Sequence, residues 1–148
     1  EVVVGVTATD VLFQLSSQEL FHNGRDNSEI AKMPRVARLA SHLLSQRSFY
    51  PLFPPPSMSS TVADAPVDLR QHQKWKLPLQ PDVLITPSKL QPFARDVQGC
   101  LVLNPGHLSK GAGGGTFSQL TVHPLTAEGE ETVAHGVPAR TRAEITRI

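Results

Sequence analysis

The chain has 148 residues, of which 39% are hydrophobic and 13 are proline, and its formal net charge is +1. This length is enough for one domain that buries roughly 70% of the surface of its unfolded chain. The near-neutral charge excludes a bulk field that would draw the chain onto nucleic acid or an anionic membrane. No apolar run approaches the roughly 20 residues of a membrane-spanning helix. The apolar start is too interrupted for a signal peptide, so we expect a soluble, reducing compartment.

The chain contains one cysteine, Cys100. One cysteine excludes an internal disulfide and a cysteine-based zinc site within this chain. Cys100 lies inside an apolar run, where a free cysteine is usually a small buried hydrophobe. We therefore predict that it is buried.

A strand and a short helix are the first predicted elements. Glu1–Val6 reads as a strand that begins without an initiator methionine, which indicates a cut through a larger protein. An apolar set at helical spacing follows over Val11–Leu15. Thr9 or Asp10 is expected to cap this helix by accepting a hydrogen bond from a free backbone N–H. A ligand role in this loop is the alternative, and capping is favoured.

The second predicted helix has Pro34 as its first residue and runs to about Gln46, because aliphatic side chains then fall on one face. His42 is expected on a solvated face of this helix. In the following segment, Arg47–Pro56, prolines alternate with aromatic residues and favour an extended path. Such a segment either docks a partner or clamps across its own domain with its aromatic rings as anchors, and the clamp is favoured.

Residues 57–80 show little periodicity and are predicted to form an exposed loop. Trp75 lies between Lys74 and Lys76, an arrangement that would suit stacking on a nucleic-acid base. Two lysines and one ring are a weak signal, so we favour a local packing anchor.

The central stretch predicts three strands separated by turn chemistry, at Val83–Ile85, Cys100–Leu103 and Thr116–Val122. Asn104-Pro105-Gly106 is a strong turn signal, because proline presets φ and glycine accepts a positive φ. The acidic segment 126–137 is expected to be a hairpin tip, and Arg140–Ile148 a last strand. These elements predict an α/β layer.

No reaction centre is visible in the residues. Gly106–Gly111 has the spacing of a P-loop, but Ala112 and Gly113 stand where lysine and a hydroxyl residue are required. The six histidines form no HxH or HExxH pair for a metal, and no serine lies in a G-x-S-x-G elbow. Gly113–Gly115 is better explained by a corner where backbones approach closely. We expect no catalytic residue, no cofactor and no metal ligand.

Three blocks together resemble the carboxy-terminal part of the B (accessory) subunits of DNA polymerase alpha–primase. They are GVTATDVLFQL (Gly5–Leu15), LLSQRSFYPLFPP (Leu43–Pro55) and Pro81–Leu120. The third is the most specific, with PDVLI-x-PS-x-L, then G-x4-NPG-x-L-x-KG, then GGTF. The Arg-Ile ending also resembles this family, so Ile148 is expected to be the true C-terminus.

The resemblance implies an α+β, calcineurin-like phosphoesterase fold, a β-sandwich flanked by helices that has lost its catalytic metals. Residues 1–148 would be the second half of that domain, with the first half and an oligonucleotide-binding domain upstream. Enzymes with this fold carry a late G-H-x-H motif that supplies metal ligands. Here Gly106 is followed by His107, but Ser109 replaces the second histidine. One imidazole cannot replace the paired ligands of a two-metal site.

By the same resemblance, the chain would belong to a non-catalytic nuclear scaffold. Its expected partners are the C-terminal region of the catalytic subunit of DNA polymerase alpha and the primase subunits, with DNA bound only indirectly and no membrane contact. Candidate partner-binding residues are Tyr50, Pro51, Phe53, Asn104 and His107.

Two other function classes stay open. One is an active metallophosphoesterase. The other is a single-stranded nucleic-acid-binding module that uses Lys74, Trp75, Lys76, Lys89 and Lys110. A half-domain should also expose sheet surface, so the isolated chain is expected to aggregate or to be only partly ordered.

Overall fold

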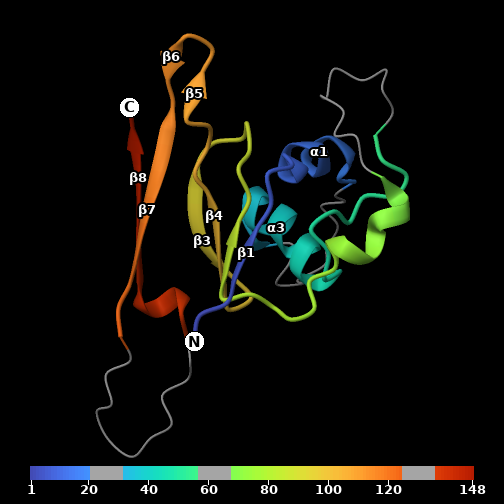
Figure 1. Ribbon diagram of the computed structural model, residues 1–148, viewed down its shortest axis with the longest axis horizontal. Coiled ribbons are helices and arrows are strands. Elements are labelled where there is room, and N and C mark those ends of the chain that lie inside the picture. Colours follow the sequence, from blue (N-terminus) through green and yellow to red (C-terminus); the bar gives the residue numbers. More distant parts are fainter. Residues whose placement is uncertain (21–31, 57–67, 125–135) are drawn as a thin grey trace, which may run out of the picture.

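The structure, a computed structural model, describes residues 1–20, 32–56, 68–124 and 136–148. Its centre is a four-stranded sheet of β1 (Val4–Val6), β2 (Val83–Ile85), β4 (Cys100–Asn104) and β3 (Phe93–Val97), in that spatial order (Figure 1). The first three strands are parallel, and β3 pairs antiparallel with β4. Every residue of β4 is buried, because both faces of the sheet are covered at this strand. The strands predicted at β2 and β4 are confirmed, whereas the first strand begins only at Val4.

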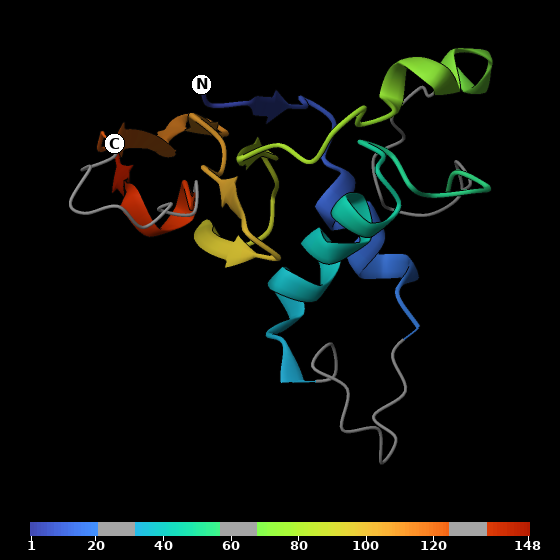
Figure 2. The ribbon, with the colours of Figure 1, turned by 90° about the horizontal axis from the view of Figure 1, so that it is seen from below.

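In the described part of the chain, two helices cover one face of this sheet (Figure 2). α1 (Val11–Gln18) follows Asp10, whose Oδ1 accepts a hydrogen bond from the Phe13 N–H at 3.1 Å, so the predicted cap is confirmed. α3 (Arg35–Ser45) begins one residue later than predicted, with Pro34 as its N-cap. Their apolar faces meet Leu84, Val97, Cys100 and Val102 of the sheet in one core. Cys100 is buried as predicted.

An antiparallel ribbon lies on the opposite face of the sheet (Figure 2). β7 (Thr116–Val122) pairs with β8 (Thr141–Arg147) along its whole length, which confirms both predicted strands. A short 3-10 helix, η2 (Pro138–Arg140), precedes β8. Val137 and Leu120 pack here against Val83 and Leu101. Most of the predicted acidic hairpin tip, residues 125–135, lies outside the described residues.

β3 is a strand that the sequence pattern does not predict. Its burial is uneven, because Arg95 and Asp96 are exposed at the edge of the sheet, so the apolar alternation is lost. Gln98 and Gly99 connect β3 to β4 with φ values of 55° and 80°. Two positive φ values are the geometry of a two-residue type I′ hairpin. Gln-Gly is a weaker signal for this turn than Asn-Gly or Asp-Gly.

A small hairpin of β5 (Ser109–Lys110) and β6 (Gly113–Gly114) extends the chain between β4 and β7. Gly115 lies so close to the backbone of His107 that an added Cβ would be 1.9 Å from the His107 carbonyl oxygen. At Gly114 the corresponding atom is the Ile148 carbonyl oxygen, at 2.6 Å. The predicted corner of closely approaching backbones is therefore present.

Residues 57–67 of the predicted exposed loop lie outside the described residues, and the segment after them differs from the prediction. Leu69–Trp75 form a 3-10 helix, η1, and Asp68 caps it by accepting a hydrogen bond from the Arg70 N–H at 3.1 Å. Leu77 is buried, and its N–H donates to the Arg47 carbonyl at 2.8 Å. The side chains from Arg70 to Lys74 are exposed. A 3-10 helix has no amphipathic period of 3.6, so the hydrophobic pattern does not reveal it.

Candidate functional site

The five residues predicted to bind a partner lie in two separate places. Tyr50, Pro51 and Phe53 line a groove beside the C-terminal end of α3, whereas His107 lines a second groove beyond the end of β4. Asn104 lies beneath the second groove and is fully buried. The two grooves share no lining residue. The structure therefore does not bring the five residues into one site.

The first groove, termed the aromatic groove, has a volume of about 560 Å³. The chain turns away from α3 at Arg47, whose φ is 47°. It then runs beside the end of η1, where Ser48 forms a β-bridge with Lys76. The groove is lined by Gln46, Arg47, Ser48, Tyr50, Pro51, Leu52, Phe53, His72, Trp75, Lys76, Leu77 and Pro78.

Packing of two aromatic rings supports the aromatic groove from inside. The rings of Tyr50 and Trp75 meet edge to face, with centroids 5.9 Å apart. The buried Tyr50 hydroxyl donates a hydrogen bond to Oε1 of Gln14 on α1 at 2.7 Å. The predictions of a clamp across the domain and of Trp75 as a packing anchor are confirmed. Phe53, in contrast, is 82% exposed at the rim.

The charged side chains among the described residues of the aromatic groove are basic. Arg47 and Lys76 carry positive charge, His72 lies beside them, and this described part of the lining includes no aspartate or glutamate. Nη1 of Arg47 donates to the Pro78 carbonyl at 3.4 Å, which holds the side chain across the rim. The groove therefore presents an apolar, aromatic floor with a positive edge, which suits a ligand with apolar and acidic groups.

The second groove, termed the basic groove, has a volume of about 570 Å³. Its walls are the loop after β2, the turn after β4, the β5–β6 hairpin and the end of β8, which all lie at one end of the molecule (Figure 1). This is where the parallel strands β2 and β4 have their carboxyl ends. Ligands bind at such ends in open α/β sheets. The lining residues are Ser88, Lys89, Leu90, Pro92, Gly106, His107, Ser109, Lys110, Gly111, Gly114, Gly115, Thr116 and Arg147.

Asn104 fixes two walls of the basic groove relative to each other. Its Oδ1 accepts hydrogen bonds from the N–H groups of Ser88 and Gly106, both at 2.9 Å. Its Nδ2 donates to the carbonyls of Leu90 and Gln91 at 3.1 and 3.2 Å. All four hydrogen-bonding positions of the amide are therefore used. Asn104 shapes this surface from below and is not itself available to a partner.

His107 is exposed at the edge of the basic groove. Its backbone carbonyl accepts a hydrogen bond from the Thr116 N–H at 2.8 Å, which fixes the turn. Within residues 1–20, 32–56, 68–124 and 136–148, no three His, Cys, Asp or Glu side chains gather in a way that would hold a metal ion. The described residues around His107 therefore do not fit the two-metal centre of a phosphoesterase.

The five residues considered for nucleic-acid binding are divided between the two grooves. Lys74 lies on η1, and Trp75 and Lys76 line the aromatic groove. Lys89 and Lys110 line the basic groove. The Trp75 ring packs against Tyr50 at the edge of the core. The structure thus shows no single aromatic and basic surface formed by these five residues.

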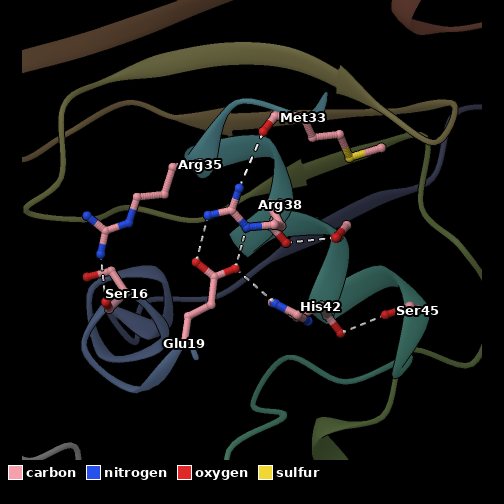
Figure 3. A network of polar contacts seen from close by, with 8 residues as sticks. Ser16, Glu19, Met33, Arg35, Arg38, His42 and Ser45 are labelled. Carbon is pink, nitrogen blue, oxygen red and sulfur yellow. Dashed lines mark hydrogen bonds and ion pairs between the residues drawn. The ribbon is translucent and has the colours of Figure 1, made fainter. Parts of the chain in front are cut away.

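A buried polar cluster joins the two helices (Figure 3). Glu19 accepts hydrogen bonds from Nε and Nη2 of Arg38 at 2.8 and 3.1 Å, and its Oε1 lies 3.4 Å from Nε2 of His42. Burial by itself raises the pKa of Glu19, but the contacts with Arg38 and His42 outweigh it and lower the pKa below 4.5. His42 is thus only partly solvated, because it reaches back to α1. The cluster has a structural role, in which it fixes α1 against α3.

Two residues of these grooves are missed by sequence reasoning. Arg147 reaches the basic groove only because β8 pairs with β7 in a register that places Arg147 opposite Thr116. Arg47 is placed on the aromatic groove by a left-handed backbone turn at the end of α3. A positive residue just past a helix is the one available signal for Arg47, and no local signal exists for Arg147.

The family model for the B subunits of DNA polymerases alpha and epsilon matches residues 1–95. The chain is 40% identical to the DNA polymerase alpha B subunit of Mus musculus over 80% of its own length and 18% of that protein. It is 37% identical to the Schizosaccharomyces pombe B subunit over 100% of this chain and 25% of the relative. For the Saccharomyces cerevisiae protein the identity is 30% over 98% of this chain and 25% of the relative.

The chain thus spans between 18% and 25% of the length of these relatives. The matched region covers more than half of the chain, and the resemblance drawn from the three sequence blocks is confirmed. The chain belongs to the family of DNA polymerase alpha/epsilon B subunits.

Proposed function

We propose that this chain is part of a non-catalytic accessory subunit that binds the C-terminal region of the catalytic subunit of DNA polymerase alpha, within its nuclear complex with primase. Residues 1–148 form the second half of an inactive, calcineurin-like phosphoesterase domain in this proposal. Family membership supports it, because the relatives are named as subunits of this polymerase. The mixed α/β layers also suit it, since a sheet is covered by helices on one face and a ribbon on the other.

The observation that carries the binding role is the exposed ring of Phe53 beside the packed pair of Tyr50 and Trp75. An exposed aromatic side chain on a rigid support is a typical anchor of a protein interface. Pro51 and Phe53 would contact the partner, while Tyr50 forms the floor of the groove. The basic rim favours an acidic stretch on the partner.

The non-catalytic part of the proposal is supported by the surroundings of His107. The glycine and histidine of the motif are present, but Ser109 holds the place of the second ligand. Among the described residues, no helix has the length and apolarity needed to cross a bilayer. In this proposal the chain contacts proteins and meets DNA only through them.

Association of the intact protein with the C-terminal region of the catalytic subunit tests the binding role. Phe53→Ala should raise the Kd by at least about tenfold, which corresponds to roughly 1.4 kcal/mol. Phe117→Ala is the matched control, because Phe117 is an exposed phenylalanine on β7 outside both grooves, and its Kd should stay within about twofold.

Equal Kd values for the two variants would remove the aromatic groove from the interface. No association at low salt would overturn the accessory role itself. Metal analysis and a phosphodiester hydrolysis assay on the same intact protein test the non-catalytic part, and stoichiometric metal with hydrolysis would contradict it.

A further inference from the structure

We propose that the basic groove binds a phosphate-bearing ligand through Lys89, Lys110 and Arg147. This site is separate from the proposed interface with the catalytic subunit, because the aromatic groove shares none of its residues. The three cations come from the loop after β2, from β5 and from the end of β8. The fold thus gathers charges that are far apart in the sequence.

The described side chains that line the basic groove are basic or neutral. The described residues of its lining include the cationic side chains of Lys89, Lys110 and Arg147 and the imidazole of His107, but no aspartate or glutamate. Within the described part of the chain, Lys89, Lys110 and Arg147 form no ion pair. The ammonium of Lys89 lies 5.9 Å from the centre of the Phe13 ring, which leaves its charge unneutralised.

Asp10 is the carboxylate that approaches this region from α1, and both of its oxygens have backbone partners. Oδ1 accepts from the Phe13 N–H at 3.1 Å, and Oδ2 accepts from the Lys89 N–H at 2.8 Å. Asp10 therefore holds the Lys89 loop against the start of α1. This contact places the lysine backbone and leaves the ammonium group for a ligand.

The charge of the groove matches a multivalent oxyanion better than a single carboxylate. A phosphate monoester carries about −1.5 to −2 charges near neutral pH and three acceptor oxygens. Arginine binds two such oxygens in a fork, and lysine supplies a point charge. Three cations would over-neutralise one carboxylate, whereas a phosphate or diphosphate balances them.

The rest of the lining favours phosphate over a base or a peptide side chain. Among the described residues of the lining there is no phenylalanine, tyrosine or tryptophan ring on which a nucleobase would stack. Its large apolar side chains are Leu90 and Pro92, which offer little anchorage for a peptide. Ser88 is buried, and its Oγ accepts from the Leu90 N–H at 3.1 Å, which fixes this wall of the groove. The volume of about 570 Å³ is that of a small-molecule site.

The experiment uses the intact protein and titrates inorganic pyrophosphate by calorimetry at about 50 mM salt, where phosphate contacts are strong. In the double variant Lys110→Gln/Arg147→Gln the Kd should rise at least about tenfold. The matched control Lys74→Gln/Arg95→Gln also removes two exposed cations, but from η1 and β3, and should change the Kd less than about twofold.

Two further probes distinguish the sources of the phosphate. Binding of ATP but not of a ten-residue oligothymidylate assigns the site to a free nucleotide, and tighter binding of the oligothymidylate assigns it to a nucleic-acid strand. Either result supports the site if the double variant Lys110→Gln/Arg147→Gln no longer binds that ligand. Hexaglutamate that binds as tightly as pyrophosphate, or a failure of every phosphate probe, overturns the proposal. Both double variants should still bind the catalytic subunit, so a failure of the phosphate site can be told apart from a failure of the proposed function.

Discussion

Glu19 and Arg38 form a two-point ion pair between α1 and α3, with nitrogen–oxygen distances of 2.8 and 3.1 Å (Figure 3). Their side chains are only 8% and 10% exposed. Loss of one partner costs more in this buried pair than in the exposed pair of Arg142 and Glu144 on the ribbon, because water cannot take the place of the lost partner.

Glu19→Gln should therefore lower the free energy of unfolding at pH 7 by about 2–3 kcal/mol, since Arg38 keeps its charge without a carboxylate. The folded-state pKa of Glu19 is lowered, so its contribution is present above pH 4.5 and is lost as the pH falls through the folded-state value. Urea titrations of the intact protein at pH 7 and pH 4, followed by hydrogen exchange in α1 and α3, measure the difference in free energy of unfolding between wild type and Glu19→Gln. This difference should be smaller at pH 4 than at pH 7.

The control for this pair is Glu144→Gln, which should cost at most about 0.5 kcal/mol because its partner is exposed. A difference between wild type and Glu19→Gln that grows on acidification would contradict the assigned direction of the pKa shift.

Asn104→Ala should destabilise the walls of the basic groove by roughly 2–6 kcal/mol, because four hydrogen bonds worth about 0.5–1.5 kcal/mol each are lost. Asn104→Asp should also destabilise these walls, because the second carboxylate oxygen would face the carbonyl oxygens of Leu90 and Gln91. Limited proteolysis of the intact protein at residues 88–92 reports both effects. Gln80→Ala removes one exposed hydrogen bond to the Gln98 carbonyl and should leave the cleavage rate unchanged. Wild-type cleavage of Asn104→Asp would show that the amide nitrogen is not needed.

Cys100 should resist alkylation in the folded protein. Burial first, and then the negative charges of Asp82 and Asp96, raise the pKa of its thiol to about 12. About one thiol in 10,000 is then ionised at pH 8, and the thiolate is the reactive form. Iodoacetamide at pH 8, followed by mass spectrometry of the peptide that contains Cys100, should show modification only after unfolding in guanidinium. Rapid labelling of the native protein would mean that β4 opens readily.

The 148 residues on their own should associate through the free edge of β1. Val4 and Val6 are 52% and 61% exposed on a strand whose one partner among the described strands is β2. An unpaired apolar edge recruits other strands. Light scattering after gel filtration should show large species for the isolated chain and fewer for Val4→Lys/Val6→Lys. A monomer with a sharp cooperative melt would show that these residues already form a complete domain.

Elements with a strong local signal could be predicted from the sequence. Aliphatic spacing after Pro34 predicts α3, because one apolar face must be buried. Asp10 caps α1 because its short carboxylate reaches a free N–H three residues on. The fully buried β4 reads as a continuous apolar run between turn residues. The family is also recognisable from sequence, since it is carried by ordered motifs.

The tertiary structure alone decides which distant residues meet. β3 has no apolar alternation and forms because β4 offers it a partner across a tight turn. Packing of the segment after α3 on α1 brings the Tyr50 hydroxyl to Gln14. The register of β8 on β7 brings Arg147 to the groove that Lys89 and Lys110 line. Local sequence determines dihedral preference and which face is apolar, whereas these contacts depend on how separate elements pack. The chain alone therefore predicts the elements and the family, and the two grooves exist only once those elements have docked.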